Sequence, residues 1–77
     1  MAAKAYVLIE VEVGKAGAVV DAVQKLEGVK SADSVAGPYD VVTAIEAEDL
    51  DAVGNLVKQI HRISGICKTT TLIGVKF

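Results

Sequence analysis

The chain has 77 residues, a net charge of −2 and a single cysteine, so we expect one small domain without internal disulfides. Hydrophobic residues make up 52% of the sequence and the mean hydropathy is +0.45, which is high for a small chain that must cover its own apolar surface. Self-association is the simplest way to bury the excess. With one cysteine and one histidine, we expect neither a metal site nor a cofactor.

The distribution of apolar and charged residues also argues against a membrane or a nucleic acid as the partner. Apolar runs are far shorter than the roughly 20 residues that span a bilayer, and Glu10 and Glu12 interrupt the N-terminal one. Lysine and arginine form no run, and the only aromatic residues are Tyr6, Tyr39 and Phe77. The sequence therefore predicts a cytoplasmic protein that does not bind DNA or RNA directly.

The first half of the chain predicts a strand, a helix and a second strand. Residues 5–13 are rich in β-branched side chains and alternate in polarity, which favours a strand. Over residues 15–26 the spacing becomes helical, with one apolar stripe that ends before Gly28: Ala16, Val19, Val20, Val23 and Leu26. Residues 29–36 are a weaker strand of the kind found at sheet edges.

The second half begins with a corner at Gly37 and Pro38, which we expect to join residues 29–36 to a strong strand at 40–47 through about two residues, as an antiparallel hairpin. Glu48 and Asp49 open a second helix. Its predicted buried stripe is Leu50, Val53, Leu56, Val57, Ile60 and Ile63. Gly65 ends this helix, and residues 66–75 form the last strand.

The predicted order is β-α-β-β-α-β, and the two halves echo each other: Gly28-Val29 and Gly65-Ile66 are 37 residues apart, as are Gly37 and Gly74. This order predicts an α+β, ferredoxin-like fold, with a four-stranded antiparallel sheet and both helices on one face. The first strand carries apolar side chains on both of its faces. We therefore expect the bare face of the sheet to pack on a second copy of the chain.

Three segments resemble a known family: Val35-Ala36-Gly37-Pro38-Tyr39-Asp40, Asp49-Leu50-Asp51-Ala52-Val53, and Gly65-Ile66-Cys67-Lys68-Thr69-Thr70-Thr71-Leu72-Ile73. In order and spacing they resemble the effector-binding domain of the leucine-responsive regulator (Lrp/AsnC) family, also called the RAM domain. The resemblance covers essentially the whole chain, as a single domain over residues 1–77. Family regulators also carry a DNA-binding helix-turn-helix domain, for which we find no segment, so the chain resembles the stand-alone form of the domain.

The resemblance implies an assembly and a ligand. In the family, the domain dimerises through its sheets as an α/β barrel-like dimer, dimers close into rings, and amino acids bind between dimers. The same homo-oligomer and an amino-acid effector are implied here. Our leading hypothesis, given below, adds mixed oligomers with a full-length Lrp/AsnC-type regulator.

The corner and the threonine-rich strand suit such a ligand. Backbone N–H groups near Gly37 can approach a carboxylate, Asp40 can pair with an ammonium group, and the hydroxyls of Thr69 and Thr71 share one face of a strand. With Tyr39, these are the predicted ligand-binding residues. Simpler explanations exist for each: turn chemistry at Gly37, coverage of an edge of the core by Tyr39, backbone capping by Asp40 and the strand preference of threonine.

The leading hypothesis is a non-catalytic regulatory module that binds an amino acid or a related metabolite. One alternative is a structural oligomerisation module without a ligand. The other is a small dimeric α+β barrel enzyme, which would need His61 or paired carboxylates in a cavity between the sheet and the helices. We expect His61 to be solvated at a helix end and Cys67 to be a buried small apolar residue.

Overall fold

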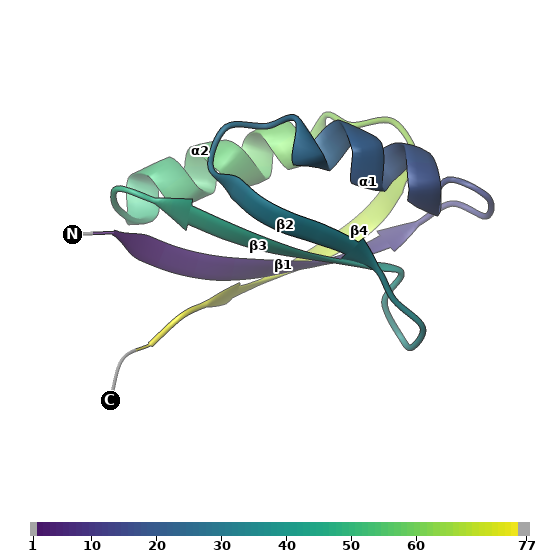
Figure 1. Cartoon of the computed structure of the whole chain (residues 1–77), viewed down its shortest axis with the longest axis horizontal. Coiled ribbons are helices and arrows are strands. Elements are labelled where there is room, and N and C mark those ends of the chain that lie inside the picture. Colours follow the sequence, from purple (N-terminus) through teal and green to yellow (C-terminus); the bar gives the residue numbers. More distant parts are fainter. Residues whose placement is uncertain (1, 76–77) are drawn as a thin grey trace.

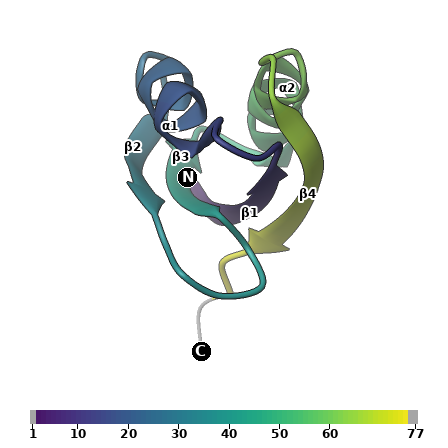
Figure 2. The same ribbon diagram turned by 90° about the vertical axis from the view of Figure 1, so that its right-hand side faces the viewer.

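The chain folds into six elements in the predicted order, and the computed structural model describes residues 2–75. The elements are β1 (Ala3–Val11), α1 (Ala16–Gln24), β2 (Val29–Ser34), β3 (Val41–Ala47), α2 (Leu50–His61) and β4 (Ile66–Ile73). The four strands form one antiparallel sheet in the order β2-β3-β1-β4, and both helices lie on the same side of it (Figures 1 and 2). The predicted ferredoxin-like fold and the position of β2 at a sheet edge are confirmed.

The core lies between the helices and one face of the sheet, as alternation along the strands requires. Its fully or almost fully buried apolar side chains are Ala5, Val7, Ile9, Val19, Val23, Ala32, Val41, Ile45, Val53, Leu56 and Ile60. The predicted stripes of both helices are confirmed except at Leu50, which is 61% exposed. Leu50 is the first residue of α2, and side chains of a first turn lean towards the helix N-terminus, past the end of the core.

The first strand ends earlier than predicted. It stops at Val11, where its pairing with β4 shifts register between Glu10 and Val11, and Val13 beyond it is fully exposed. The Glu12 N–H instead donates to the carbonyl of Gly65 at 2.8 Å. The residue that this bulge leaves unpaired is Cys67 of β4, since Glu10 pairs with Lys68 and Val11 with Ile66.

The connection between β2 and β3 is longer than the predicted two-residue corner, and that prediction is wrong. Residues 35–40 form a loop, because the Val35 N–H donates to the carbonyl of Asp40 at 2.9 Å and closes the hairpin there rather than at Gly37. In Figures 1 and 2 this loop extends from the sheet on the side opposite the helices.

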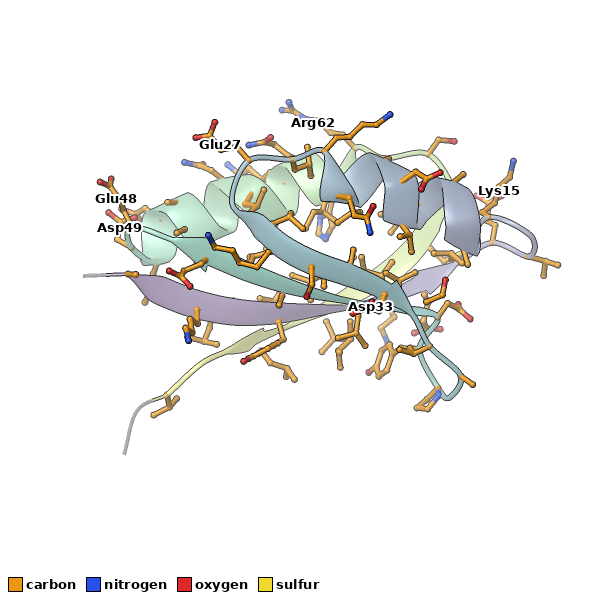
Figure 3. The ribbon with its side chains drawn as sticks, in the orientation of Figure 1. Lys15, Glu27, Asp33, Glu48, Asp49 and Arg62 are labelled. Carbon is orange, nitrogen blue, oxygen red and sulfur yellow. The ribbon has the colours of Figure 1, made fainter. Side chains whose placement is uncertain are left out.

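The helix ends follow local chemistry. Asp49 is the N-cap of α2, and its Oδ1 accepts a hydrogen bond from the Ala52 N–H at 2.8 Å. Glu48 and Asp49 lie together at this end of the helix (Figure 3). After each helix the chain reverses through a glycine with positive φ, Gly28 at +98° and Gly65 at +95°, which explains the sequence echo at these two positions.

Candidate functional site

The predicted site falls into two parts, of which the first is the loop of residues 35–40. Gly37 has a φ of +151°, a conformation that other residues rarely adopt, and a Cβ there would meet no atom within 4 Å. Gly37 and Pro38 are exposed, whereas Tyr39 and Asp40 are half-buried where the loop enters β3. The loop backbone is therefore open to a ligand or to another chain.

Asp40 ties this loop to the centre of the sheet. Its N–H donates to the carbonyl of Ile9 at 2.9 Å, and its Oδ2 accepts from the N–H of Val11 at 2.9 Å. The carboxylate therefore satisfies a backbone donor at the β1 irregularity, close to the capping role weighed for it from the sequence. A carboxylate has lone pairs for further partners, so this bond leaves room for a ligand ammonium group.

The second part of the predicted site lies on β4. Thr69 and Thr71 pair with Ile9 and Val7 of β1, whose side chains face the helices, whereas Thr70 pairs with Leu8. Thr69 and Thr71 therefore lie on the helix-covered face, and the predicted alternation is confirmed. Both are half-buried, because β4 is the outer strand of the sheet and only its inner edge is paired.

One chain does not bring the two parts into a single pocket. Asp40 bonds to one side of Ile9, and Thr69 pairs with Ile9 from the other side, so β1 lies between them. Two strand spacings separate their backbones by about 10 Å. The depression that Thr69 lines includes no residue of the 35–40 loop. A site that uses both parts would therefore need a second copy of the chain.

The depression beside Thr69 has a volume of about 240 Å³ and is lined by His61, Ile66, Cys67, Lys68 and Thr69. His61 is exposed at the end of α2, as expected, and its Nε2 is hydrogen-bonded to Thr69 Oγ1. Cys67 is exposed, so its predicted burial is wrong. It lies beside the register shift of β1 against β4, and β4 is an edge strand with no neighbour to cover it.

Sequence reasoning missed the pairing of His61 with Thr69. The signal that could have found it is the glycine-containing reversal between a helix end and a strand start, which brings residues about eight apart together. Side-chain periodicity places each residue on its own element but does not show that the two elements meet at that point.

Two further depressions adjoin each other at the opposite end of the sheet, with volumes of about 330 Å³ and 250 Å³. Both are lined by Lys30 and Glu46. The first also includes Ala2, Ala47 and Glu48, and the second Lys4, Tyr6, Ala44 and Ile45. Positive and negative side chains mix there, so the charges do not favour one sign of ligand.

Over residues 2–75, no three His, Cys, Asp or Glu side chains gather as a group that could hold a metal ion. Within the same residues, neither helix is long and apolar enough to cross a membrane.

The fold is an α+β domain with one face of its sheet left open, and comparison with known proteins identifies its family. The sequence model described as "Lrp/AsnC ligand binding domain" matches residues 4–76. The chain therefore belongs to the Lrp/AsnC ligand-binding domain family, as the resemblance predicted, and is a regulatory ligand-binding module. No functionally curated protein matches the sequence.

Solved structures share the fold over nearly the whole chain. TTHA0845 from Thermus thermophilus is 30% identical, with 97% of this chain and 95% of that one covered and a TM-score of 0.92. AsnC of E. coli is 21% identical, with coverage of 97% and 52% and a TM-score of 0.88. The transcriptional regulator NMB0573 from Neisseria meningitidis, solved as a complex with L-Met, is 17% identical, with coverage of 96% and 50% and a TM-score of 0.84. This chain thus spans about half of each of these two regulators.

Proposed function

We propose that this domain is a non-catalytic regulatory module that binds an amino acid or a related small metabolite between copies of the chain. The family match over residues 4–76 is the observation that carries the proposal, because it concerns a ligand-binding domain and covers almost the whole chain. The complex of NMB0573 with L-Met supports an amino acid as the class of ligand.

The uncovered face of the sheet supports assembly through a second copy. Its centre is apolar: Tyr6 and Leu72 are cross-strand neighbours that are 44% and 48% exposed, and Leu8 pairs with Val42 on the neighbouring strand. The loop of residues 35–40 and the end of β4 extend on the same side of the sheet (Figure 1). A sheet packed against this face would bury the apolar centre between the two extensions.

Opposite charges flank the apolar centre at both ends. Lys4 pairs across strands with Glu46 at one end, and Glu10 pairs with Lys68 at the other. Polar rims around an apolar centre are typical of protein interfaces, and here each end carries both signs. The same surface can therefore pack on a second copy across a two-fold axis without bringing only like charges into contact.

The proposed ligand position follows from the separation of the two parts of the predicted site, the loop of residues 35–40 and β4. Because β1 separates Asp40 from Thr69 within one chain, a ligand that contacts both parts must lie between copies. Gly37, Tyr39, Asp40, Thr69 and Thr71 remain the proposed contacts. Such a site couples ligand binding to assembly, since only the assembled state offers both parts.

A ring of dimers and mixed oligomers with a full-length Lrp/AsnC-type regulator belong to the same proposal. In mixed oligomers, the ligand-bound module would change the assembly, and thereby the DNA binding, of its partner. The single-domain organisation over residues 1–77 and the cytoplasmic location stay predictions from the sequence.

The test combines light scattering with titration calorimetry against the twenty amino acids. We expect a mass above that of a monomer, heat from at least one amino acid, and a shift in mass or melting temperature with that ligand. Thr71→Val should weaken the binding and keep the fold. Assembly without any heat would favour the structural module, and a monomer that binds nothing would contradict the proposal altogether.

A further inference from the structure

We infer that the outer face of α2 pairs with the same face of a second copy of the chain, antiparallel and across a two-fold axis. This face consists of six exposed residues of the helix and its two ends: Glu48, Asp51, Gly54, Asn55, Lys58 and Arg62. The inference goes beyond the proposed function, because the face contains none of the proposed ligand contacts and its pairing needs no ligand.

The spacing along α2 directs these residues away from the core. Positions 51, 54, 55, 58 and 62 follow one another at three or four residues, so they lie along one side of the helix. The buried Val53, Leu56 and Ile60 lie along the other side. Glu48 and Arg62 stand at opposite ends of α2 (Figure 3). The outer face is thus an exposed row with acidic side chains at one end and basic side chains at the other.

The opposite charges of this row are too far apart to pair within one helix. Asp51 and Lys58 are seven residues apart, about 10 Å along the axis, whereas helical side chains pair at three or four residues. The residue four positions after Lys58 is Arg62, which carries a like charge. On α1, by contrast, Asp21 and Lys25 are opposite charges at the pairing distance. The charges of α2 are therefore available to another chain.

An antiparallel copy brings these opposite charges together. With the two-fold axis midway between Asp51 and Lys58, each lies about 5 Å from the axis, on opposite sides of it. Asp51 then faces Lys58 of the second copy, and Glu48 and Arg62 match farther from the axis in the same way. Because the symmetry forms every such pair twice, the face is complementary to itself.

Gly54 allows the two helices to approach closely near this axis. Glycine is among the least favourable residues inside a helix, yet the chain itself does not require one here. A Cβ at Gly54 would meet no atom within 4 Å, and its φ is not positive, unlike that of Gly28 and Gly65. The helix dipole can account for acidic residues at the start of α2 and basic residues at its end, but not for this glycine. A second helix does account for it, since the side chains at the contact set the distance between two axes.

The contact is weak by itself and acts between larger units. Exposed ion pairs each contribute little and are screened by salt, and one helix face is small beside a standard protein interface. The outer face of α2 and the uncovered face of the sheet lie on opposite sides of the chain (Figure 2). Copies joined through their sheets therefore keep two α2 faces free, and a weak contact can join such dimers at high protein concentration.

Sedimentation of the intact protein over a range of concentrations, at low and at high sodium chloride, tests the inference. We expect the mass to rise with concentration at low salt and to fall at high salt, because salt screens exposed charges. Asp51→Lys and Lys58→Asp should each raise the dissociation constant of the contact about tenfold, since two attractions become two repulsions. Asp21→Lys and Lys25→Asp are the matched controls, with the same changes of charge at exposed positions of α1 and its C-cap.

A one-to-one mixture of the Asp51→Lys and Lys58→Asp variants separates pairing from a defect in folding. In the mixture the more basic face of one variant meets the more acidic face of the other, so association should return to at least the parent level. A structural defect of either variant would persist. Gly54→Gln should also weaken the contact but keep or raise the melting temperature, because glutamine is a better helix former than glycine.

The inference is overturned if both charge variants associate like the parent protein, or if the α1 controls lose as much association as they do. A mass that stays constant over the whole concentration range, or a mixture that associates no better than its components, would also contradict it. These results leave the proposed function standing, since the heat of amino-acid binding does not depend on the outer face of α2. Salt-sensitive pairing without heat from any amino acid would support the inference and contradict the proposed ligand.

Discussion

Asp40 Oδ2 accepts a hydrogen bond from the N–H of Val11 at 2.9 Å, which joins residues 29 positions apart in the sequence. The bond lies where the β1 ladder is irregular and where the β2–β3 loop enters β3. Asp40 therefore supports the sheet directly, whether or not it also meets a ligand, and substitutions at this position have to be interpreted with both roles in view.

Asp40→Ala should lower the free energy of unfolding by about 1–2 kcal/mol, because it leaves the part-buried Val11 N–H without its charged acceptor. Asp40→Asn keeps an oxygen at this position and should lose less than half as much. Urea denaturation of both variants, with circular dichroism as the signal, measures the difference. Equal stability of Asp40→Ala and the parent protein would show that the bond contributes nothing to folding.

Thr43 is completely buried in β3, and its hydroxyl has no hydrogen-bond partner within residues 2–75. Thr43→Val keeps the shape of the side chain and removes the unsatisfied oxygen, so we expect the free energy of unfolding to rise by about 1 kcal/mol. Thr70→Val on the uncovered face is the control and should change it by less than about 0.5 kcal/mol. A loss of stability in Thr43→Val would reveal a partner for the hydroxyl, such as a buried water molecule.

Two glycines should respond oppositely to the same substitution. Gly65→Ala places a Cβ at a φ of +95° and within 3.1 Å of Lys15, which should cost at least about 1–2 kcal/mol. Gly54 lies inside α2, and a Cβ added there would meet no atom within 4 Å, so Gly54→Ala should stabilise the protein by about 0.5–1 kcal/mol. The urea midpoint at constant m-value measures both, and changes of the same sign would contradict the backbone argument.

The N-cap of α2 gives a fourth stability test. Asp49→Ala removes the acceptor of the Ala52 N–H and should cost about 1 kcal/mol, the usual value for a lost cap. Asp49→Asn retains a capping oxygen and should remain close to the parent protein in thermal denaturation. If the Asn variant falls as far as the Ala variant, the negative charge at the helix end matters more than the hydrogen bond.

Leu72→Glu tests assembly through the uncovered face. The substitution puts a charge beside Tyr6 in the apolar centre of the uncovered face. Because burying that charge against a second copy is unfavourable, light scattering should show dissociation. Leu50→Glu is the matched control, because Leu50 is 61% exposed but belongs to α2 on the other side of the sheet. An unchanged mass for Leu72→Glu would place the interface elsewhere.

The fold could be predicted from the sequence because its determinants are local. The helical stripes, the strand alternation and the glycines at positions 28 and 65 each reflect a backbone geometry of a few residues, and together they imply the βαββαβ order. The same reasoning placed Thr69 and Thr71 on one face and β2 at an edge, both of which the structure confirms. The family resemblance also rested on short segments in order.

The tertiary structure decided what depends on contacts between distant segments. Local patterns do not contain the register shift at Glu10 and Val11, and therefore could not foresee that Asp40 would bond Val11 or that Cys67 would be exposed. The length of the 35–40 loop likewise depends on where the two strands stop pairing. The physical reason is that side-chain periodicity determines the type and faces of an element, whereas strand register and helix–strand packing depend on all the elements together.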